Sequence, residues 1–173
     1  MLYPTDIAFG PDGMLLVSEY GGNDRIQAFD RDGNPLYAFG TFGFGEGEFN
    51  RPQSIEYDQS RNELVILDSC NHRVVVTDLM GKWKFSVGTP GRGPGELNYP
   101  YGLVLEPDGT FLIGEFGNSR IQHLGRDGAC LGLYGAMGAE PGFLQTPWGL
   151  AGDDERLYVV DYLNNRVQVL ARP

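Results

Sequence analysis

Residues 68–73 of this chain, Asp-Ser-Cys-Asn-His-Arg, form a motif that occurs four times at nearly constant spacing. Each copy has an acidic residue, then an asparagine, then an arginine two positions after the asparagine. The four copies are Glu19, Asn23 and Arg25; Asp68, Asn71 and Arg73; Glu115, Asn118 and Arg120; and Asp161, Asn164 and Arg166. A proline precedes each copy, at Pro4, Pro52, Pro100 and Pro147, so the period is 48, 48 and 47 residues. A fixed period in this range predicts a repeat architecture.

One period contains four short segments that suit antiparallel strands. In the third repeat these are residues 101–105, 110–113, 120–124 and 129–134. The segment 120–124 alternates polar and apolar side chains, as a half-buried strand does, and Asp-Gly turns follow the first and third segments. Four antiparallel strands in about 40 to 50 residues are typical of a β-propeller blade. We therefore predict an all-β fold, a β-propeller of four-stranded antiparallel blades.

The repeats predict one propeller domain over residues 1–173. The four blades are expected at about 3–40, 51–88, 99–135 and 146–173. The last blade is incomplete, because the sequence ends where a third strand ends and leaves no residues for an outer strand. Unpaired strand edges and uncovered apolar faces associate unless something covers them, so self-association through open blade edges is expected.

The segments that join the repeats are also alike. They are residues 45–52 (GEGEFNRP), 93–100 (GPGELNYP) and 140–147 (EPGFLQTP). Their apolar residues Phe49, Leu97 and Leu144 are expected to fill the space between adjacent blades, and the proline fixes the entry to the next strand.

These joins, the apolar strand that follows and the acid–Asn–Arg motif together resemble the NHL repeat. The pair Asn71-His72 is the one that gives the repeat its name, and the resemblance extends over essentially the whole chain. It implies a β-propeller, usually of six blades. Three alternatives stay open: a fragment of a larger propeller, an oligomer in which partial propellers complete each other, and a compact four-bladed ring. The usual blade number favours the fragment.

The acid–Asn–Arg motif is interpreted as structural, because a feature present in every blade belongs to the blade rather than to a single site. The positions beside it vary and are better candidates for binding, since loops on a rigid scaffold carry function. Five of them are aromatic: Tyr20, Tyr101, Phe116, Trp148 and Tyr162. We predict that they lie on the loop face and bind a protein or peptide. The alternative is that they only pack on neighbouring loops.

Composition excludes several other function classes. The net charge is −10, which disfavours nucleic acid. No run of 18 apolar residues indicates a membrane span. The two histidines, His72 and His123, occupy different positions of different blades, so no metal site is predicted. The sequence has no nucleophile-elbow, phosphate-loop or CxxC motif, so no cofactor or catalytic residue is predicted. Cys70 and Cys130 also differ in position, which disfavours a disulfide and favours a reducing, cytoplasmic compartment.

The sequence therefore favours a non-catalytic propeller scaffold that binds a protein or peptide. A second hypothesis is a lyase or hydrolase whose site lies on blades outside this chain. A third is single-stranded RNA binding, which the resemblance allows for some NHL proteins and the acidic charge disfavours.

Overall fold

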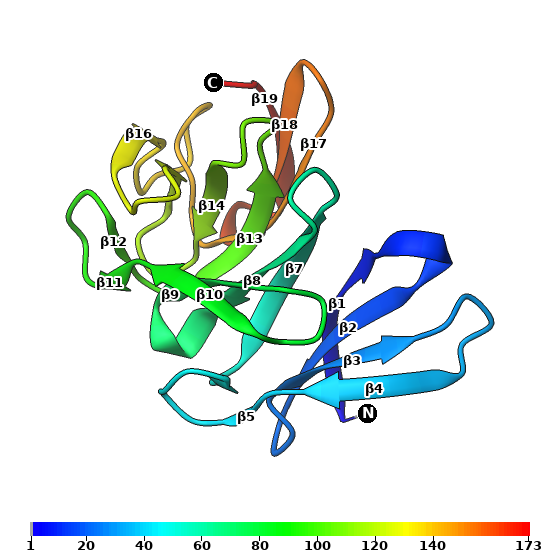
Figure 1. Cartoon of the computed structure of the whole chain (residues 1–173). Coiled ribbons are helices and arrows are strands. Elements are labelled where there is room, and N and C mark those ends of the chain that lie inside the picture. The colour runs from blue at the N-terminus through cyan, green and yellow to red at the C-terminus, as the bar shows by residue number, and fades with distance from the viewer. Residues whose placement is uncertain (1) are drawn as a thin grey trace. The chain divides into compact units, whose positions relative to one another are not determined.

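The structure is a computed structural model that describes residues 2–173. Its four main sheets are antiparallel, and each is made of strands that follow one another in the chain (Figure 1). The first sheet contains β1 (Tyr3–Phe9), β2 (Leu15–Tyr20), β3 (Arg25–Phe29) and β4 (Pro35–Phe39). The second contains β7 (Pro52–Asp58), β8 (Glu63–Asp68), β9 (Arg73–Thr77) and β10 (Trp83–Val87).

The third sheet contains β13 (Pro100–Leu105), β14 (Phe111–Glu115), β15 (Arg120–Leu124) and β16 (Cys130–Tyr134). The fourth contains β17 (Pro147–Gly152), β18 (Arg156–Asp161) and β19 (Arg166–Ala171), and within residues 2–173 it has no fourth strand. Each sheet starts at the repeat proline or one residue before it. The expected all-β fold of antiparallel blades, with a last blade that lacks its outer strand, is confirmed.

Helical structure in residues 2–173 is limited to single 3₁₀ turns. They are η1 (Pro11–Gly13), η2 (Ser69–Asn71) and η3 (Tyr162–Asn164). None of these turns is long enough to cross a membrane.

The chain divides into two compact units. The first ends at Ser86 and holds the first two sheets, and the second is Val87–Pro173 and holds the last two. Strand β10 ends one residue beyond this boundary.

Each unit has a core that lies between its two sheets. In the first unit Ile26 of β3 packs in one cluster with Ile55 and Leu64 of the second sheet. Phe49, from the segment that joins the two sheets, is 1% exposed and belongs to the same cluster. A Cβ at Gly40 would lie 2.5 Å from the Phe49 ring, so this approach requires glycine.

The core of the second unit is built in the same way. Ile121 of the third sheet packs with Leu157 and Val159 of the fourth, and Leu144 of the joining segment lies among them. Leu97 is also fully buried. The predicted role of Phe49 and Leu144 in filling the space between blades is therefore confirmed within each unit.

Two of the three joining segments are tight loops that a glutamate closes. β5 (Thr41–Phe42) pairs in parallel with β6 (Glu48–Phe49), and β11 (Thr89–Pro90) pairs in the same way with β12 (Glu96–Leu97). The Glu96 carboxylate accepts the amides of Arg92 and Gly93 at 2.9 and 2.7 Å. The glycine-rich residues 91–95 thus form a closed crossing loop.

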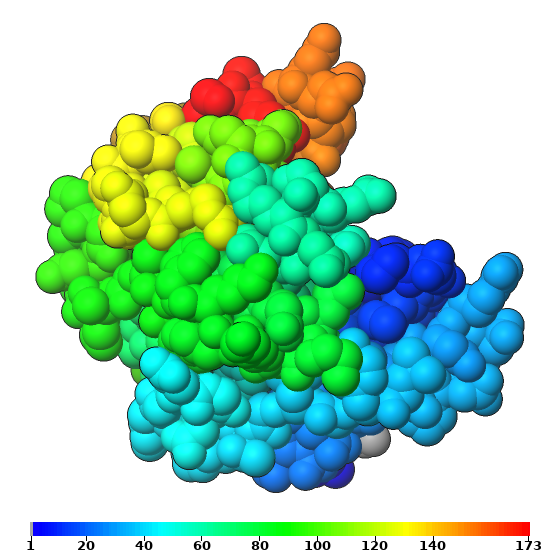
Figure 2. All heavy atoms as spheres, in the orientation of Figure 1, coloured from blue at the N-terminus to red at the C-terminus, as the bar shows by residue number. Residues whose placement is uncertain are grey.

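The loop of the first unit lies at the protein surface. Figure 2 shows the part of the chain around residues 41–48, in light blue to cyan, at the surface of the molecule. Phe42 and Phe44 are 59% and 70% exposed and contact each other edge to face. These rings do not contribute to the core.

The residue before a repeat proline has a left-handed backbone in three repeats. Arg51, Tyr99 and Thr146 have φ of 60°, 48° and 52°. This conformation is unfavourable for residues other than glycine, and most of all for a β-branched threonine. Backbone carbonyls of the joining segments bind the loop that follows the second strand of the next sheet. The Tyr99 carbonyl accepts the Phe116 amide at 3.0 Å, and the Gln145 carbonyl accepts the Leu163 amide at 3.2 Å.

Glu56 is a titratable group on an inner strand of the first unit. Burial, and secondly the negative charge of Asp6, raise its pKa from 4.5 to about 7. Asp6 accepts hydrogen bonds from the Ser54 hydroxyl and the Ile55 amide at 2.6 and 3.0 Å. These hydrogen bonds hold the Asp6 side chain on this part of the second sheet.

Glu56 should make the protein less stable as the pH rises through neutrality. The folded protein holds the Glu56 proton more tightly than the unfolded chain, so the stability that this group contributes is present below pH 4.5 and is lost as the pH rises through 7. Relative to Glu56→Gln, the free energy of unfolding of the native protein should fall by roughly 1–3 kcal/mol between pH 5 and pH 8. Urea denaturation across this range measures it. Glu46→Gln, at an exposed loop position, is the control, and parallel curves for the native protein and Glu56→Gln would contradict the prediction.

Candidate functional site

The acid of each repeat motif is a buried carboxylate at the end of the second strand of its sheet. Glu19, Asp68, Glu115 and Asp161 are all closed to water. Each accepts the backbone amide of the residue two positions before a repeat proline. The donors are Leu2, Asn50, Asn98 and Gln145, at 2.7 to 2.9 Å. The carboxylate therefore holds the start of its own sheet.

The motif arginine pairs with this carboxylate and also binds the joining loop. Arg120 donates from Nε to Glu115, and from its terminal nitrogens to the carbonyls of Arg92, Gly93 and Glu96. Arg73 and Arg166 repeat this arrangement, each with an Nε–carboxylate distance of 2.8 Å and three loop carbonyls. The planar guanidinium has five donors, which suits one carboxylate and several carbonyls.

The motif asparagine bridges the same two partners. Asn118 donates to Glu115 at 2.6 Å and to the Gly91 carbonyl at 3.0 Å. Asn71 and Asn164 bind their own acid and a loop carbonyl in the same way. Asn23 makes no such bond within residues 2–173, and there Glu19 accepts from Arg25 and Gln27, both at 2.6 Å. We call each carboxylate with its arginine, its amide donor and any asparagine bridge a loop clamp.

The four clamps differ in electrostatics because they lie at different depths. Burial raises the pKa of Asp68 and Glu115, in spite of the arginine beside each. Burial also opposes ionisation of Glu19 and Asp161, but hydrogen bonds outweigh it and lower their pKa. For Glu19 the donors are Arg25, Gln27 and the Leu2 amide.

Two of these clamps hold the aromatic residues of the second unit. Phe116 and Tyr162 follow Glu115 and Asp161, while Tyr101 and Trp148 follow Pro100 and Pro147. The structure brings these four predicted residues together, with ring-centroid distances of 4.9 Å for Tyr101–Phe116, 5.1 Å for Tyr101–Trp148, 5.8 Å for Phe116–Trp148 and 5.3 Å for Trp148–Tyr162. We call them the aromatic cluster.

The rings of the aromatic cluster are unequally exposed. Tyr101 is 7% exposed and packs against Phe116 and Trp148. Trp148 is 38% and Tyr162 53% exposed. Trp148 stands nearly perpendicular to Tyr101 and Phe116, at 79° and 82°, an arrangement that aromatic rings favour. The cluster therefore presents two fixed rings to solvent on a packed base.

The fifth predicted aromatic residue, Tyr20, makes its ring contacts within the first unit. It stacks on Tyr3 at 5.3 Å, and the Arg51 guanidinium lies 4.8 Å from its ring centre. Most equivalent positions of the first unit are polar. Thr5 donates to the Pro52 carbonyl at 2.7 Å, and Gln53 accepts from Arg51 at 3.3 Å.

The histidines and cysteines do not form a common site. His123 Nε2 lies 2.7 Å from the Thr110 hydroxyl, and His72 has a left-handed backbone in the loop after η2. Cys70, whose pKa burial raises, and Cys130 are unpaired thiols. Among residues 2–173, no three His, Cys, Asp or Glu side chains group closely enough to hold a metal ion.

The loop clamp predicts a large cost for removing its arginine. Arg120→Ala leaves Glu115 buried without its charge partner, so the free energy of unfolding should fall by about 3–5 kcal/mol. Arg120→Lys keeps the charge but not the planar set of donors, so its free energy of unfolding should lie between those of the native protein and Arg120→Ala. Arg156→Ala is the control, because its pair with Asp153 is long, at 3.8 Å, and exposed, so it should cost less than about 1 kcal/mol. Equal losses for Arg120→Ala and Arg156→Ala in urea denaturation would contradict the role of the clamp.

Comparison with known proteins supports the repeat assignment. Residues 49–76 match the sequence profile of the NHL repeat, which confirms the resemblance for that segment. This segment includes Phe49 of the joining loop and the whole clamp motif of the second sheet. No curated protein sequence matches the chain.

Solved structures share the fold at low sequence identity. A catalytically inactive virginiamycin B lyase from Staphylococcus aureus, crystallised with quinupristin, has a TM-score of 0.67 at 16% identity, over 99% of this chain and 56% of that one. A protein of unknown function from Bacteroides thetaiotaomicron has a TM-score of 0.77 at 15% identity, over 97% and 47%. A nidogen/laminin complex has a TM-score of 0.62 at 17% identity, over 97% and 75%.

These likenesses show the β-propeller fold. The chain spans little more than half the length of the lyase structures that it matches.

Proposed function

We propose that this NHL-repeat propeller chain is a non-catalytic module that binds a protein or peptide through the aromatic cluster. The observation that carries the proposal is the pair of exposed rings, Trp148 and Tyr162, held on the buried ring of Tyr101. Large aromatic side chains bury much area on binding and lose little conformational freedom when they are already fixed.

The fold itself does not require aromatic residues at these positions. The first unit has Thr5, Gln53 and Ser69 at three of the positions equivalent to the cluster, and its sheets form the same clamps. Residues needed only to complete a blade should be alike in every blade. The aromatic cluster is therefore better explained by recognition of a ligand than by packing of the blade.

Protein binding is also a known use of this fold. The nidogen/laminin complex contains a chain that shares it, which supports a protein or peptide as the ligand class. The chemistry of the aromatic cluster agrees, because its two exposed rings, Tyr162 and Trp148, carry a hydroxyl and an indole N–H beside an apolar surface.

Binding can be followed on Trp148 itself. The chain has two tryptophans, and Trp83 belongs to the first unit, where it lies beside Arg73. In a Trp83→Phe variant, Trp148 is the single fluorescent indole. Peptides selected from a random displayed library on the immobilised chain should shift Trp148 emission to shorter wavelength, because binding removes the partly exposed indole from water.

Alanine substitution then tests the site. Trp148→Ala and Tyr162→Ala should each weaken binding of a selected peptide by about tenfold or more in calorimetry. Leu133→Ala, at an exposed residue of β16 outside the cluster, should leave it unchanged. Unchanged affinity in a folded Trp148→Ala variant would overturn the proposal, as would selected peptides that leave Trp148 emission unaltered.

A further inference from the structure

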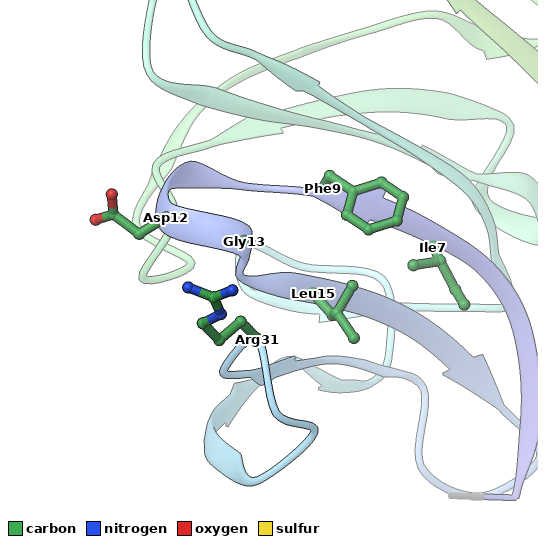
Figure 3. Close-up of a pocket in the computed structure, with 6 residues that line it drawn as sticks. All are labelled: Ile7, Phe9, Asp12, Gly13, Leu15 and Arg31. Carbon is green, nitrogen blue, oxygen red and sulfur yellow. The ribbon is translucent and has the colours of Figure 1, made fainter.

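The first sheet has an apolar face that the structure leaves exposed. Ile7 and Phe9 of β1 are 55% and 72% exposed, and together with Leu15 of β2 they line an open hollow of about 880 Å³. Figure 3 shows these side chains on the two strands, with Asp12 and Arg31 at the turn end of the hollow.

The equivalent face is buried in the other sheet of the first unit. Ile7 and Leu15 correspond in the repeat to Ile55 and Leu64, which are 2% and 0% exposed. These two side chains pack in one cluster with Ile26 of the preceding sheet. This face of a blade is therefore covered by the opposite face of the blade before it.

The fourth sheet leaves exposed the face that, in the first and third sheets, packs against the sheet that follows in the chain. Ile26 of the first sheet and Ile121 of the third pack against the sheet that follows each. Their equivalent in the fourth sheet is Val167, which is 61% exposed. Beside it, Val160 and Val169 are 42% and 54% exposed.

In the second unit an ion pair joins the two sheets beside their apolar contact. Arg172 of the fourth sheet binds both carboxylate oxygens of Glu106, in the third sheet, at 3.0 and 3.1 Å. The residue of the first sheet equivalent to Arg172 is Arg31, which makes no hydrogen bond or ion pair within residues 2–173. The residue of the fourth sheet equivalent to Glu106 is Asp153, whose side chain is 46% exposed.

We infer that two copies of this chain associate head to tail. The face of Ile7, Phe9 and Leu15 on one copy packs against the face of Val160, Val167 and Val169 on the other. Arg31 of the first copy then pairs with Asp153 of the second. The second copy fits this surface because it presents an apolar face of the kind that covers the equivalent positions inside each unit, together with an acidic residue at the position of the acidic partner in the second unit.

A head-to-tail contact uses two different surfaces, so variants that damage one surface each can complement one another. Light scattering on a sizing column should give the native protein a mass of 38.2 kDa, twice the chain mass of 19.1 kDa, or a higher multiple. Phe9→Asp and Val167→Asp should each be monomers of 19.1 kDa when alone. Their equimolar mixture should restore a species of 38.2 kDa, twice 19.1 kDa, through the one interface that both mutants leave intact.

Charge reversal tests the same contact without changing the apolar faces. Arg31→Asp and Asp153→Arg should each weaken association, and the double variant should restore it. Leu131→Asp, at a 54% exposed residue of β16, should keep the native mass. Circular dichroism confirms that each variant is folded. A monomeric native protein, variants with native mass, or a mixture that stays monomeric would each overturn the inference.

Discussion

A carboxylate that is closed to water needs hydrogen-bond donors inside the protein, and in this fold the donors come both from the residues that follow the carboxylate and from the joining segment that precedes its sheet. Glu115 accepts from Arg120, from the side chain of Asn118 and from the backbone amide of Asn98. The arginine then reaches the carbonyls of the joining loop. One buried charge thus fixes a strand end, a loop and the start of a sheet, and loss of the arginine leaves this buried charge without its partner.

The clamp also determines where variation is tolerated. Because the carboxylate and its donors hold the backbone, the next side chain is not needed for the loop and can change from one blade to another. Ser69 follows the clamp acid in the second sheet, and Phe116 and Tyr162 follow it in the last two. The aromatic cluster is built at these positions, so a rigid frame presents an apolar surface without depending on it.

Sequence alone predicted the blades and the residues of the loop clamps well, because the repeat shows which residues every blade needs. It identified the four acids and their arginines as structural, and it placed Trp148 and Tyr162 on one loop face. It did not predict that Tyr101 is nearly buried, since burial depends on rings from another sheet. The left-handed Thr146 was also missed, because local preference opposes that conformation and only the hydrogen bonds of the folded loop favour it.

The most direct test of the loop clamp is native-state hydrogen exchange at the backbone amides that donate to the buried acids. Asn98 and Gln145 lie in joining segments, outside the main sheets, and an ordinary loop amide exchanges quickly. If the clamp organises the fold, these two amides should exchange only on global unfolding, while the amide of Glu155, which donates to the exposed Asp153, exchanges rapidly. Exchange of the Asn98 and Gln145 amides at the rate of Glu155 would show that the buried carboxylates do not hold the sheets to their loops.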